Sequence, residues 1–521
     1  MASHARKALT LVLIALCFSA GLSAQTKDRM TITVTNYQMA PTDPNGEMLK
    51  YYSDKFKATF KIINIDGQDP QKYHELLNIK LASGEIPDFL YLFDASTLGN
   101  YVKQGVITSI TEAQFRKGAP RLAKVLDTYA PGYLKMGMVN GKLYGIPVVS
   151  PTNIFHIPLV YRLDWMKKVG VTKVPETLAE FESLMYKFAN NPNLNGDGKK
   201  TYGLSKDGLT AVFGAFGLVP FDDSDYWVLE KGKIVNSSVS PAAKQALALV
   251  AKWYKDGVLD PEFITGENQG GYWALSHAFI KGRIGFSSHA NYYHWLPTGA
   301  FQQFDAATGK KVPNEPGANA KEIKAANPVA EWTYGPPLKG PSGTQGIKSW
   351  NRLENFITFG KLTEKTPGKI DKILEILDAN ASDDPVERIT LKFGAQDKYW
   401  KMLEPETETW AFIPPYDKDT SYWSRIGGEL SIEIPTTPKA SREQWAFQNK
   451  FDKNGIESLI QVGLPMGQKY ETELKKIRDS AYISIITGAK PLSAFDDFVK
   501  AWAAAGGDKV QAEAEAYYKN N

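Results

Sequence analysis

The sequence predicts an α/β protein made of two lobes. Strand-like and helix-like stretches alternate from Met30 to Phe93, and this alternation is typical of a parallel sheet with helices on its faces. The chain has 521 residues, which is enough for two or more domains. Between Gly141 and Val169 two extended pieces flank a polar break, Ser150-Pro151-Thr152-Asn153. That pattern suits a crossing from one lobe to the other, and its small polar residues suit a ligand.

Residues 1–24 are predicted to be a signal peptide and not part of the fold. Ala8 to Leu22 is continuously apolar or small, and Leu22-Ser23-Ala24 is an acceptable cleavage site that leaves Gln25 first. The apolar run is short for a membrane span. We therefore expect an exported protein in a periplasm.

The only cysteine, Cys17, lies inside this signal segment, so the mature chain has no disulfide and no thiol chemistry. A lipid anchor would need a small residue just before that cysteine, and Leu16 argues against one. Removing residues 1–24 takes away Arg6 and Lys7 and no acid, so the formal net charge falls from +4 to +2. This near-neutral charge gives no reason to expect a nucleic-acid partner.

The first lobe is predicted to hold a parallel sheet. Strands are expected at Met30–Thr35, Ala58–Ile65 and Phe89–Phe93, and helices at Glu47–Phe56 and from Pro70 to Ser83. In such sheets ligands lie at the carboxyl ends of the strands. The residues at those positions are Asn36, Tyr37 and Asp94.

The second lobe is expected to begin after the crossing. Thr177-Leu178-Ala179-Glu180 has the pattern of a capping box, and Ser240-Pro241 begins another helix. A short strand, Arg283–Phe286, runs into a polar and aromatic cluster at residues 287–295. The ligand candidates in this cluster are His289, Asn291, Tyr292 and Trp295.

The rest of the chain supplies two further crossings. Thr298–Ser349 has little periodicity and is expected to form long loops with a second crossing. Tyr399–Pro438 contains Trp410, Tyr416 and Trp423 among prolines and acids, which suits a third crossing and the rim of a cleft. Gln444 onward is predicted to be mainly helical. Lobe 1 is assigned residues 25–150 and about 345–400, and lobe 2 residues 151–344 and about 401–521.

Several stretches resemble extracellular solute-binding proteins of family 1, in the large oligosaccharide-binding branch that includes alginate-binding proteins. They occur in the family's order from about residue 30 to the C-terminus. The matching stretches are Leu81–Asp88 (LASGEIPD), Gly141–Pro147 (GKLYGIP), Arg162–Trp165 (RLDW), Lys252–Pro261 (KWYKDGVLDP) and Pro337–Pro341 (PLKGP).

This resemblance implies the two-lobed periplasmic-binding-protein fold, in which α/β lobes joined by hinge strands close on a ligand. It implies that the chain is the substrate-binding component of an ABC importer, and its expected partners are an oligosaccharide or sugar derivative and a membrane permease. We expect a monomer with no catalytic residue and no required cofactor. Aromatic rings cover the flat faces of sugars, and polar side chains satisfy their hydroxyls. The candidates for stacking are Tyr292, Trp295, Trp410, Tyr416 and Trp423, and those for hydroxyl recognition are Asn36, Asp94, Asn153, His289 and Asn291.

A possible metal site follows the same resemblance. Residues 193–201 resemble the calcium loop of this branch, with ligand positions at Asn193, Asn195, Asp197, Lys199 and Thr201. The usual acids at the first and ninth positions are replaced here by Asn193 and Thr201, which leaves one carboxylate. Both a structural calcium and a metal-free turn stay open. The spacing of His277, His289 and His294 fits no common transition-metal pattern.

Two other functions are weighed against a sugar-binding protein. Paired acids such as Glu404 and Glu406 would suit a secreted glycoside hydrolase, although such pairs are common on solvated surfaces. A binding protein for peptides or other nutrients would keep the fold and change the ligand. Since no nucleophile or phosphate-binding motif occurs at a strand–helix turn, we favour sugar binding.

Overall fold

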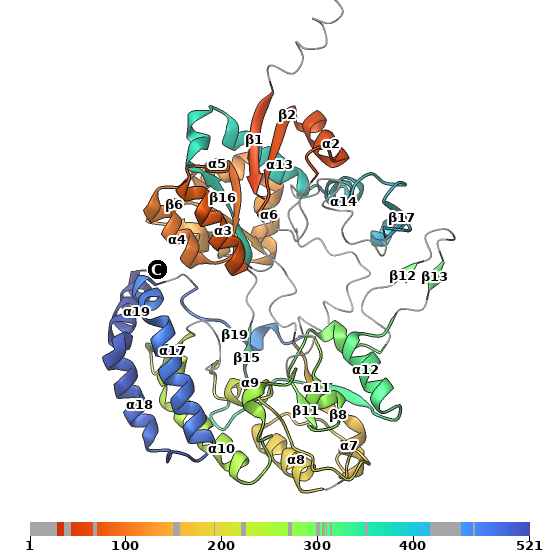
Figure 1. The fold of residues 1–521 in the computed structure, drawn as a ribbon, viewed down its shortest axis with the longest axis vertical. Coiled ribbons are helices and arrows are strands. Elements are labelled where there is room, and N and C mark those ends of the chain that lie inside the picture. The colour runs from red at the N-terminus through yellow and green to blue at the C-terminus, as the bar shows by residue number, and fades with distance from the viewer. Residues whose placement is uncertain are drawn as a thin grey trace, which may run out of the picture.

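The computed structural model describes residues 29–35, 43–65, 70–149, 157–191, 193–219, 226–268, 274–297, 303–304, 308, 310–312, 315–349, 353–416, 450–461 and 464–520. The chain forms two lobes, drawn one above the other in Figure 1, and each has its own hydrophobic core. Strands and helices are mixed in both lobes, so the predicted two-lobed α/β fold is confirmed. Among the described helices, none is both long and apolar enough to cross a membrane.

The first lobe is built on a six-stranded sheet, whose strands are β1 (Met30–Thr35), β2 (Ala58–Ile63), β3 (Phe89–Leu92), β4 (Ile107–Thr108), β7 (Gly145–Val149) and β16 (Leu353–Gly360). β1, β2 and β3 are parallel, whereas β16 runs antiparallel to β3, β4 and β7. Both faces of this sheet are covered, because Phe89 belongs to one buried cluster and Leu90 to another.

The helices of this lobe are α2 (Glu47–Phe56), α3 (Pro70–Ala82), α4 (Ala95–Gln104), α5 (Glu112–Gly118), α6 (Pro120–Tyr129), α13 (Lys369–Asn380) and α14 (Pro385–Phe393), with the 3-10 turns η1 (Tyr133–Gly137) and η5 (Lys361–Lys365). Two hairpins complete it, β5 (Met138–Val139) with β6 (Lys142–Leu143), and β17 (Trp400–Glu404) with β18 (Thr409–Phe412). The first hairpin turns at Asn140 and Gly141, which both have positive φ, of 50° and 74°. Positive φ at both residues is typical of a two-residue hairpin turn.

The second lobe has a smaller central sheet in which β8 (Leu159–Arg162) lies between β11 (Phe286–Ser287) and β14 (Trp332–Gly335), antiparallel to both. A parallel bridge from Tyr202 to Ile284 adds an extended segment beside the chain that leads into β11, and a parallel bridge from Leu204 to Leu259 adds another segment beyond it. The remaining strand pairs here are β9 (Trp227–Glu230) with β10 (Lys233–Asn236), β12 (Gln303–Phe304) with β13 (Lys311–Val312), and β15 (Ile347–Lys348) with β19 (Gly455–Ile456).

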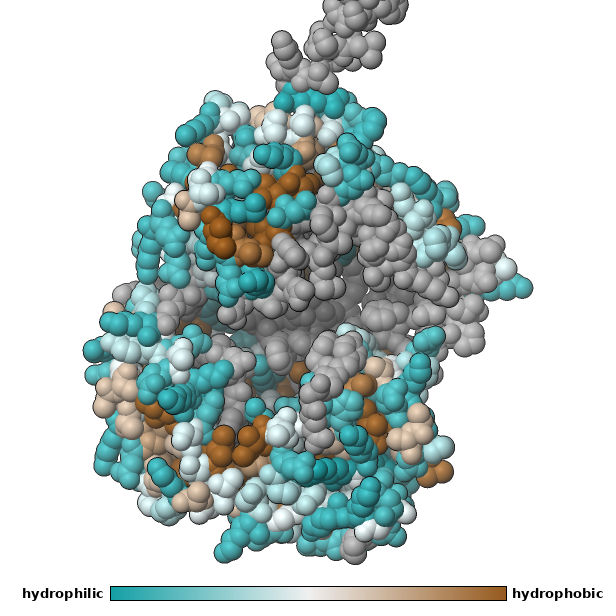
Figure 2. All heavy atoms as spheres, viewed as in Figure 1, coloured by the Kyte–Doolittle hydropathy of each residue, from teal (hydrophilic) through white to brown (hydrophobic). Residues whose placement is uncertain are grey.

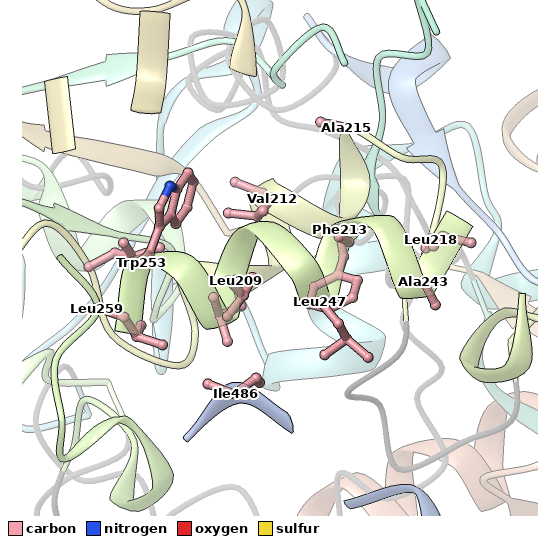
Figure 3. Packing of buried hydrophobic residues seen from close by; sticks show 14 of the residues in the cluster. Leu209, Val212, Phe213, Ala215, Leu218, Ala243, Leu247, Trp253, Leu259 and Ile486 are labelled. Carbon is pink, nitrogen blue, oxygen red and sulfur yellow. The ribbon is translucent and has the colours of Figure 1, made fainter. Parts of the chain in front are cut away.

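Helices form most of this lobe, namely α7 (Leu163–Lys168), α8 (Leu178–Asn190), α9 (Leu209–Gly214), α10 (Pro241–Lys255), α11 (His277–Ile280), α12 (Ala318–Ala326), α17 (Pro465–Ile486), α18 (Ala494–Trp502) and α19 (Asp508–Asn520). Figure 3 shows how they pack: Leu247 of α10 lies beside Phe213 of α9, Trp253 lies near the other end of α10, and Ile486 approaches from the C-terminal α17. The C-terminal helices are therefore part of this lobe's core.

Two sequence expectations need correction. Residues 401–416 do not belong to the second lobe, because Met402, Trp410 and Phe412 of the β17–β18 hairpin pack against the core of the first. The stretch 298–349 is not loop alone, since α12 and β14 form within it. The helix α12 was missed because the nine residues ANAKEIKAA bury few apolar side chains, of which Ile323 is the largest.

Candidate functional site

One edge of each lobe's sheet lies at the link between the lobes. In lobe 1 the carboxyl end of β3 is beside the beginning of β16, because Leu92 pairs with Phe356. β7 ends at the same edge, where Val149 pairs with Leu353. In lobe 2, β8 begins at Leu159, the first strand after this crossing. Both edges therefore border the interlobe region, and the described surface around it carries hydrophilic and hydrophobic residues in Figure 2.

Asp94 lies at the lobe-1 edge and begins α4. Its two carboxylate oxygens accept hydrogen bonds from the Thr97 backbone N–H at 2.6 Å and the Thr97 hydroxyl at 2.8 Å. The His74 Nδ1 is 3.6 Å from the same carboxylate. Burial lowers the pKa of His74, and the nearby charge of Asp94 opposes that shift. Asp94 is thus both a helix cap and a half-exposed polar group at this edge.

His289 lies at the lobe-2 edge, just beyond the end of β11. Since Ser287 pairs with Val160, His289 extends past the beginning of β8. Its Nδ1 is 2.8 Å from Oδ2 of Asp207. The bridge between Tyr202 and Ile284 is parallel, so the two chains that follow reach the same edge and bring these side chains together. The sequence prediction of His289 did not include its partner.

The residues that follow His289 are held tightly. Ala290 is buried and has a φ of 63°. This value lies in the left-handed region of backbone conformation, which residues other than glycine seldom adopt. Asn291 is half-buried, and its amide nitrogen is 3.4 Å from the Tyr293 hydroxyl. Tyr292 is only 2% exposed, so the prediction that its ring stacks on a ligand is wrong. These three residues stand at the same edge as His289.

The prediction that Trp295 stacks on a ligand is wrong. Its ring is fully buried and lies 5.1 Å from Phe279, edge to face. No ring face is left for a sugar. The indole N–H instead donates to the His289 carbonyl oxygen at 2.9 Å. Trp295 therefore supports the candidate site from inside the core.

Trp410 and Tyr416 lie on the first lobe. Trp410 packs against Phe393 at 4.9 Å and Phe412 at 4.8 Å between ring centres, and Tyr416 lies 4.7 Å from Tyr399. Both remain half-buried. Four further candidates lie outside the described residues: Asn36, Tyr37, Asn153 and Trp423.

A buried carboxyl lies behind the lobe-2 edge and was also missed. Glu267 is fully buried, and one of its oxygens accepts a hydrogen bond from the Ser276 hydroxyl at 2.5 Å and another from the Ser287 hydroxyl. Burial, together with the negative charge of Asp207, raises the pKa of Glu267 to about 7.

The lobes also touch directly near Ser349, where the expected second crossing ends. Tyr133 of η1 donates its hydroxyl toward Glu457, at 3.4 and 3.5 Å from the two carboxylate oxygens. Ser349 donates its hydroxyl to the same carboxylate at 3.4 Å and its backbone N–H to Ile456 at 3.0 Å. Glu457 thus joins lobe 1 to the crossing that ends at Ser349.

In the loop at 193–201 several of the candidate calcium ligands make hydrogen bonds within the protein. Asn193 Oδ1 accepts the Gly198 N–H at 2.9 Å, and Asp197 Oδ1 accepts the Lys199 N–H at 3.1 Å. The Thr201 hydroxyl donates to the Phe188 carbonyl at 2.8 Å. Asn195 lies 3.5 Å from the Arg162 guanidinium. Both a structural calcium and a metal-free turn therefore remain predictions for this loop, and the described residues contain no cluster of three histidine, cysteine or acidic side chains.

The model of the bacterial extracellular solute-binding protein family matches residues 49–352. This match confirms the resemblance that the motifs predicted. The chain is also similar to three known proteins. It is 24% identical over 466 residues to the polygalacturonan/rhamnogalacturonan-binding protein YtcQ of Bacillus subtilis (strain 168). The matched region covers 85% of this chain and 82% of that protein.

A second relative is lipoprotein LipO of Bacillus subtilis (strain 168), at 22% identity over 493 residues, with 89% of this chain and 88% of that protein covered. Among solved structures, the alginate-binding protein AlgQ2 without calcium ion matches with a TM-score of 0.60 at 16% identity. That match covers 95% of this chain and 99% of the other. It shows a shared two-lobed fold.

Proposed function

The chain belongs to the family of bacterial extracellular solute-binding proteins, and from this membership we propose that it captures an oligosaccharide or sugar derivative between its lobes. The captured sugar would pass unaltered to the membrane permease of an ABC importer. Two similar proteins support this ligand class by name, since YtcQ binds polygalacturonan and rhamnogalacturonan and AlgQ2 binds alginate.

The observation that carries the proposal is the presence of a histidine–carboxylate pair at each sheet edge. Asp94 and His74 stand at the lobe-1 edge, and Asp207 and His289 at the lobe-2 edge. Carboxylates accept hydrogen bonds from hydroxyls, and imidazole nitrogens can accept or donate. A polyhydroxyl ligand between these edges would be buried from both sides, as ligands at domain interfaces commonly are.

We propose that the protein acts by binding alone, as a monomer, without a cofactor and without a nucleic-acid partner. The donor set at 193–201 supports a metal-free loop. We also propose export with cleavage after Ala24 and no lipid anchor, because Leu16 precedes the only cysteine. The intact mass of the exported protein tests this: a chain beginning at Gln25 supports it, and a lipid-modified Cys17 contradicts it.

The experiment for the ligand class is a thermal-shift screen of the mature chain. A ligand that binds only the folded state raises the melting temperature. The probes are trigalacturonate, an alginate trisaccharide, a neutral trisaccharide and a tripeptide. Stabilisation by at least one sugar and by no peptide is expected. Stabilisation by peptide alone, or release of shorter sugars after prolonged incubation, contradicts the proposal.

A further inference from the structure

The Glu457 carboxylate accepts hydrogen bonds from groups of both lobes. From lobe 1 the Tyr133 hydroxyl lies 3.4 and 3.5 Å from its two oxygens. From lobe 2 the Ser349 hydroxyl donates at 3.4 Å, and the Gln461 side-chain amide donates at 3.3 Å. A carboxylate only accepts hydrogen bonds and these three partners can all donate, so the contacts are compatible with one another. One side chain therefore joins the two lobes.

The segment that carries Glu457 is fixed to lobe 2 on both sides of this residue. On one side, Ile456 lies in β19 beside β15, and its carbonyl oxygen accepts the Ser349 N–H at 3.0 Å. On the other side, the Ser458 hydroxyl accepts the Trp227 N–H at 3.1 Å. The backbone of Glu457 is therefore held between two anchored residues, and its side chain moves with lobe 2.

Tyr133 is fixed in the same way to lobe 1. Its ring is half-buried and packs against the hydrophobic clusters on both faces of the lobe-1 sheet. The turn η1, which begins at Tyr133, lies against β7, the strand from which the chain leaves this lobe. Since each partner is held by its own lobe, the distance between the Tyr133 hydroxyl and Glu457 reports how the lobes are arranged.

The length of this contact indicates which movement it favours. An O–H···O hydrogen bond is usually about 2.5 to 3.0 Å long, so distances of 3.4 and 3.5 Å leave room for shortening. The bond strengthens as the lobes approach at this point and is lost when they separate. Alternative arrangements of a hinged protein commonly differ little in free energy, so one charge-assisted hydrogen bond can change their populations several-fold.

We propose that the Tyr133–Glu457 hydrogen bond is a latch that favours approach of the two lobes, and that the arrangement it favours is the one that captures the sugar. The second clause rests on the proposed function. The first clause concerns the chain without a ligand, and the two clauses are tested separately.

The latch is tested by pulsed electron spin resonance, which measures the distance between two spin labels. The chain that begins at Gln25 has no cysteine, so labels can be attached at Lys103→Cys in α4 and Lys321→Cys in α12, which are both exposed positions. Tyr133→Phe removes the donor and Glu457→Leu removes the acceptor. Each should shift the ligand-free distribution toward longer distances. The double variant should match the single variants, because the same bond is lost.

The matched control is Tyr101→Phe, which removes a hydroxyl that donates to Asn78 at 2.8 Å within lobe 1. It should leave the distance distribution unchanged. The melting temperature of each variant checks that the chain is folded. If Tyr133→Phe or Glu457→Leu leaves the distribution unchanged or shifts it toward shorter distances, the latch is overturned. Additive shifts in the double variant would also overturn it, since they would come from separate contacts.

The second clause is tested by titration calorimetry of the unlabelled chain with kestose, a neutral trisaccharide, and with trigalacturonate. The association constant should fall about threefold or more in Tyr133→Phe and in Glu457→Leu, because a smaller fraction of the chain is ready to capture the sugar. It should fall no further in the double variant, and Tyr101→Phe should bind as the unsubstituted chain does.

Unchanged or increased affinity in the two single variants overturns the second clause. If the unsubstituted chain binds neither sugar, the proposed function and the second clause both fail for these ligands. The distance measurement needs no ligand and decides the latch in either case.

Discussion

Arg162 and Asp164 form a buried ion pair in which both carboxylate oxygens accept hydrogen bonds from the guanidinium, at 2.8 and 2.7 Å. The Arg162 side chain is 1% exposed, and its guanidinium carbon lies 4.5 Å from the centre of the Trp165 ring. The RLDW segment is therefore a structural unit of charge, counter-charge and ring. Its role is to fix the beginning of α7 against β8.

This pair predicts a large loss of stability when one partner is neutralised. Asp164→Asn leaves the Arg162 charge buried and uncompensated, which costs about 3 to 5 kcal/mol in the free energy of unfolding. Chemical denaturation measures it. Glu176→Gln breaks the exposed Lys173–Glu176 pair and should cost less than about 1 kcal/mol. Equal effects of the two substitutions would contradict the structural role.

Tyr161 offers a prediction of the opposite sign. Its hydroxyl is buried and has no hydrogen-bond partner among the described residues. An unsatisfied buried hydroxyl destabilises the folded state, so Tyr161→Phe should raise the free energy of unfolding by about 1 kcal/mol. Tyr482→Phe is the control, because its buried hydroxyl donates to the Ser238 carbonyl at 2.6 Å. That variant should be destabilised, and a destabilised Tyr161→Phe would show that the hydroxyl is satisfied.

The sequence predicted features that depend on neighbouring residues. The Thr177 hydroxyl accepts the Glu180 N–H at 3.2 Å, and the Glu180 carboxylate accepts the Thr177 N–H at 3.0 Å, as the capping-box pattern indicates. His289 was predicted as a ligand residue because it lies in a polar and aromatic cluster that follows a strand. Local patterns of this kind also carried the family motifs.

Features that depend on contacts distant in sequence could not be predicted in the same way. Asp207 meets His289 across 82 residues, and no local pattern marks that pairing. Trp295 was assigned to the ligand because a run of aromatic residues does not reveal which rings face the core. Glu267 was missed because its burial arises from α11 and β11 together.

Glu267 makes stability depend on pH. Its pKa is raised from the ordinary value of 4.5 to about 7 by burial and by Asp207. The folded state then binds this proton more tightly than the unfolded chain, so its contribution is full below pH 4.5 and is lost as the pH rises toward 7. The loss amounts to up to about 3 kcal/mol.

Denaturation at several pH values isolates this effect by comparison with Glu267→Gln, which has the same shape and no charge. The variant should match the natural chain at the acid end and exceed it in stability above neutral pH. His294 has a lowered pKa, which reduces stability at acid pH in both chains. Subtracting the free energy of unfolding of the variant from that of the natural chain at each pH therefore cancels this opposite contribution. A constant difference across the range would show that Glu267 does not titrate.

From the hydrogen bonds of the loop at 193–201 we expect the melting temperature to be insensitive to calcium. Because Asn193 and Asp197 already accept backbone N–H groups, a chelator or added calcium should shift the melting temperature by less than about 1 °C. The double variant Asn193→Asp, Thr201→Asp restores acids at the first and ninth positions and should gain a calcium response. A concentration-dependent rise in the unsubstituted chain would reveal a calcium site.

Amide hydrogen exchange with and without a saturating bound oligosaccharide tests most directly that a sugar is held between the two sheet edges. The sugar should slow exchange in both lobes, at residues 93–98 beside Asp94 and at residues 287–295 around His289. Protection confined to one lobe, or located away from both edges, would contradict capture between the lobes.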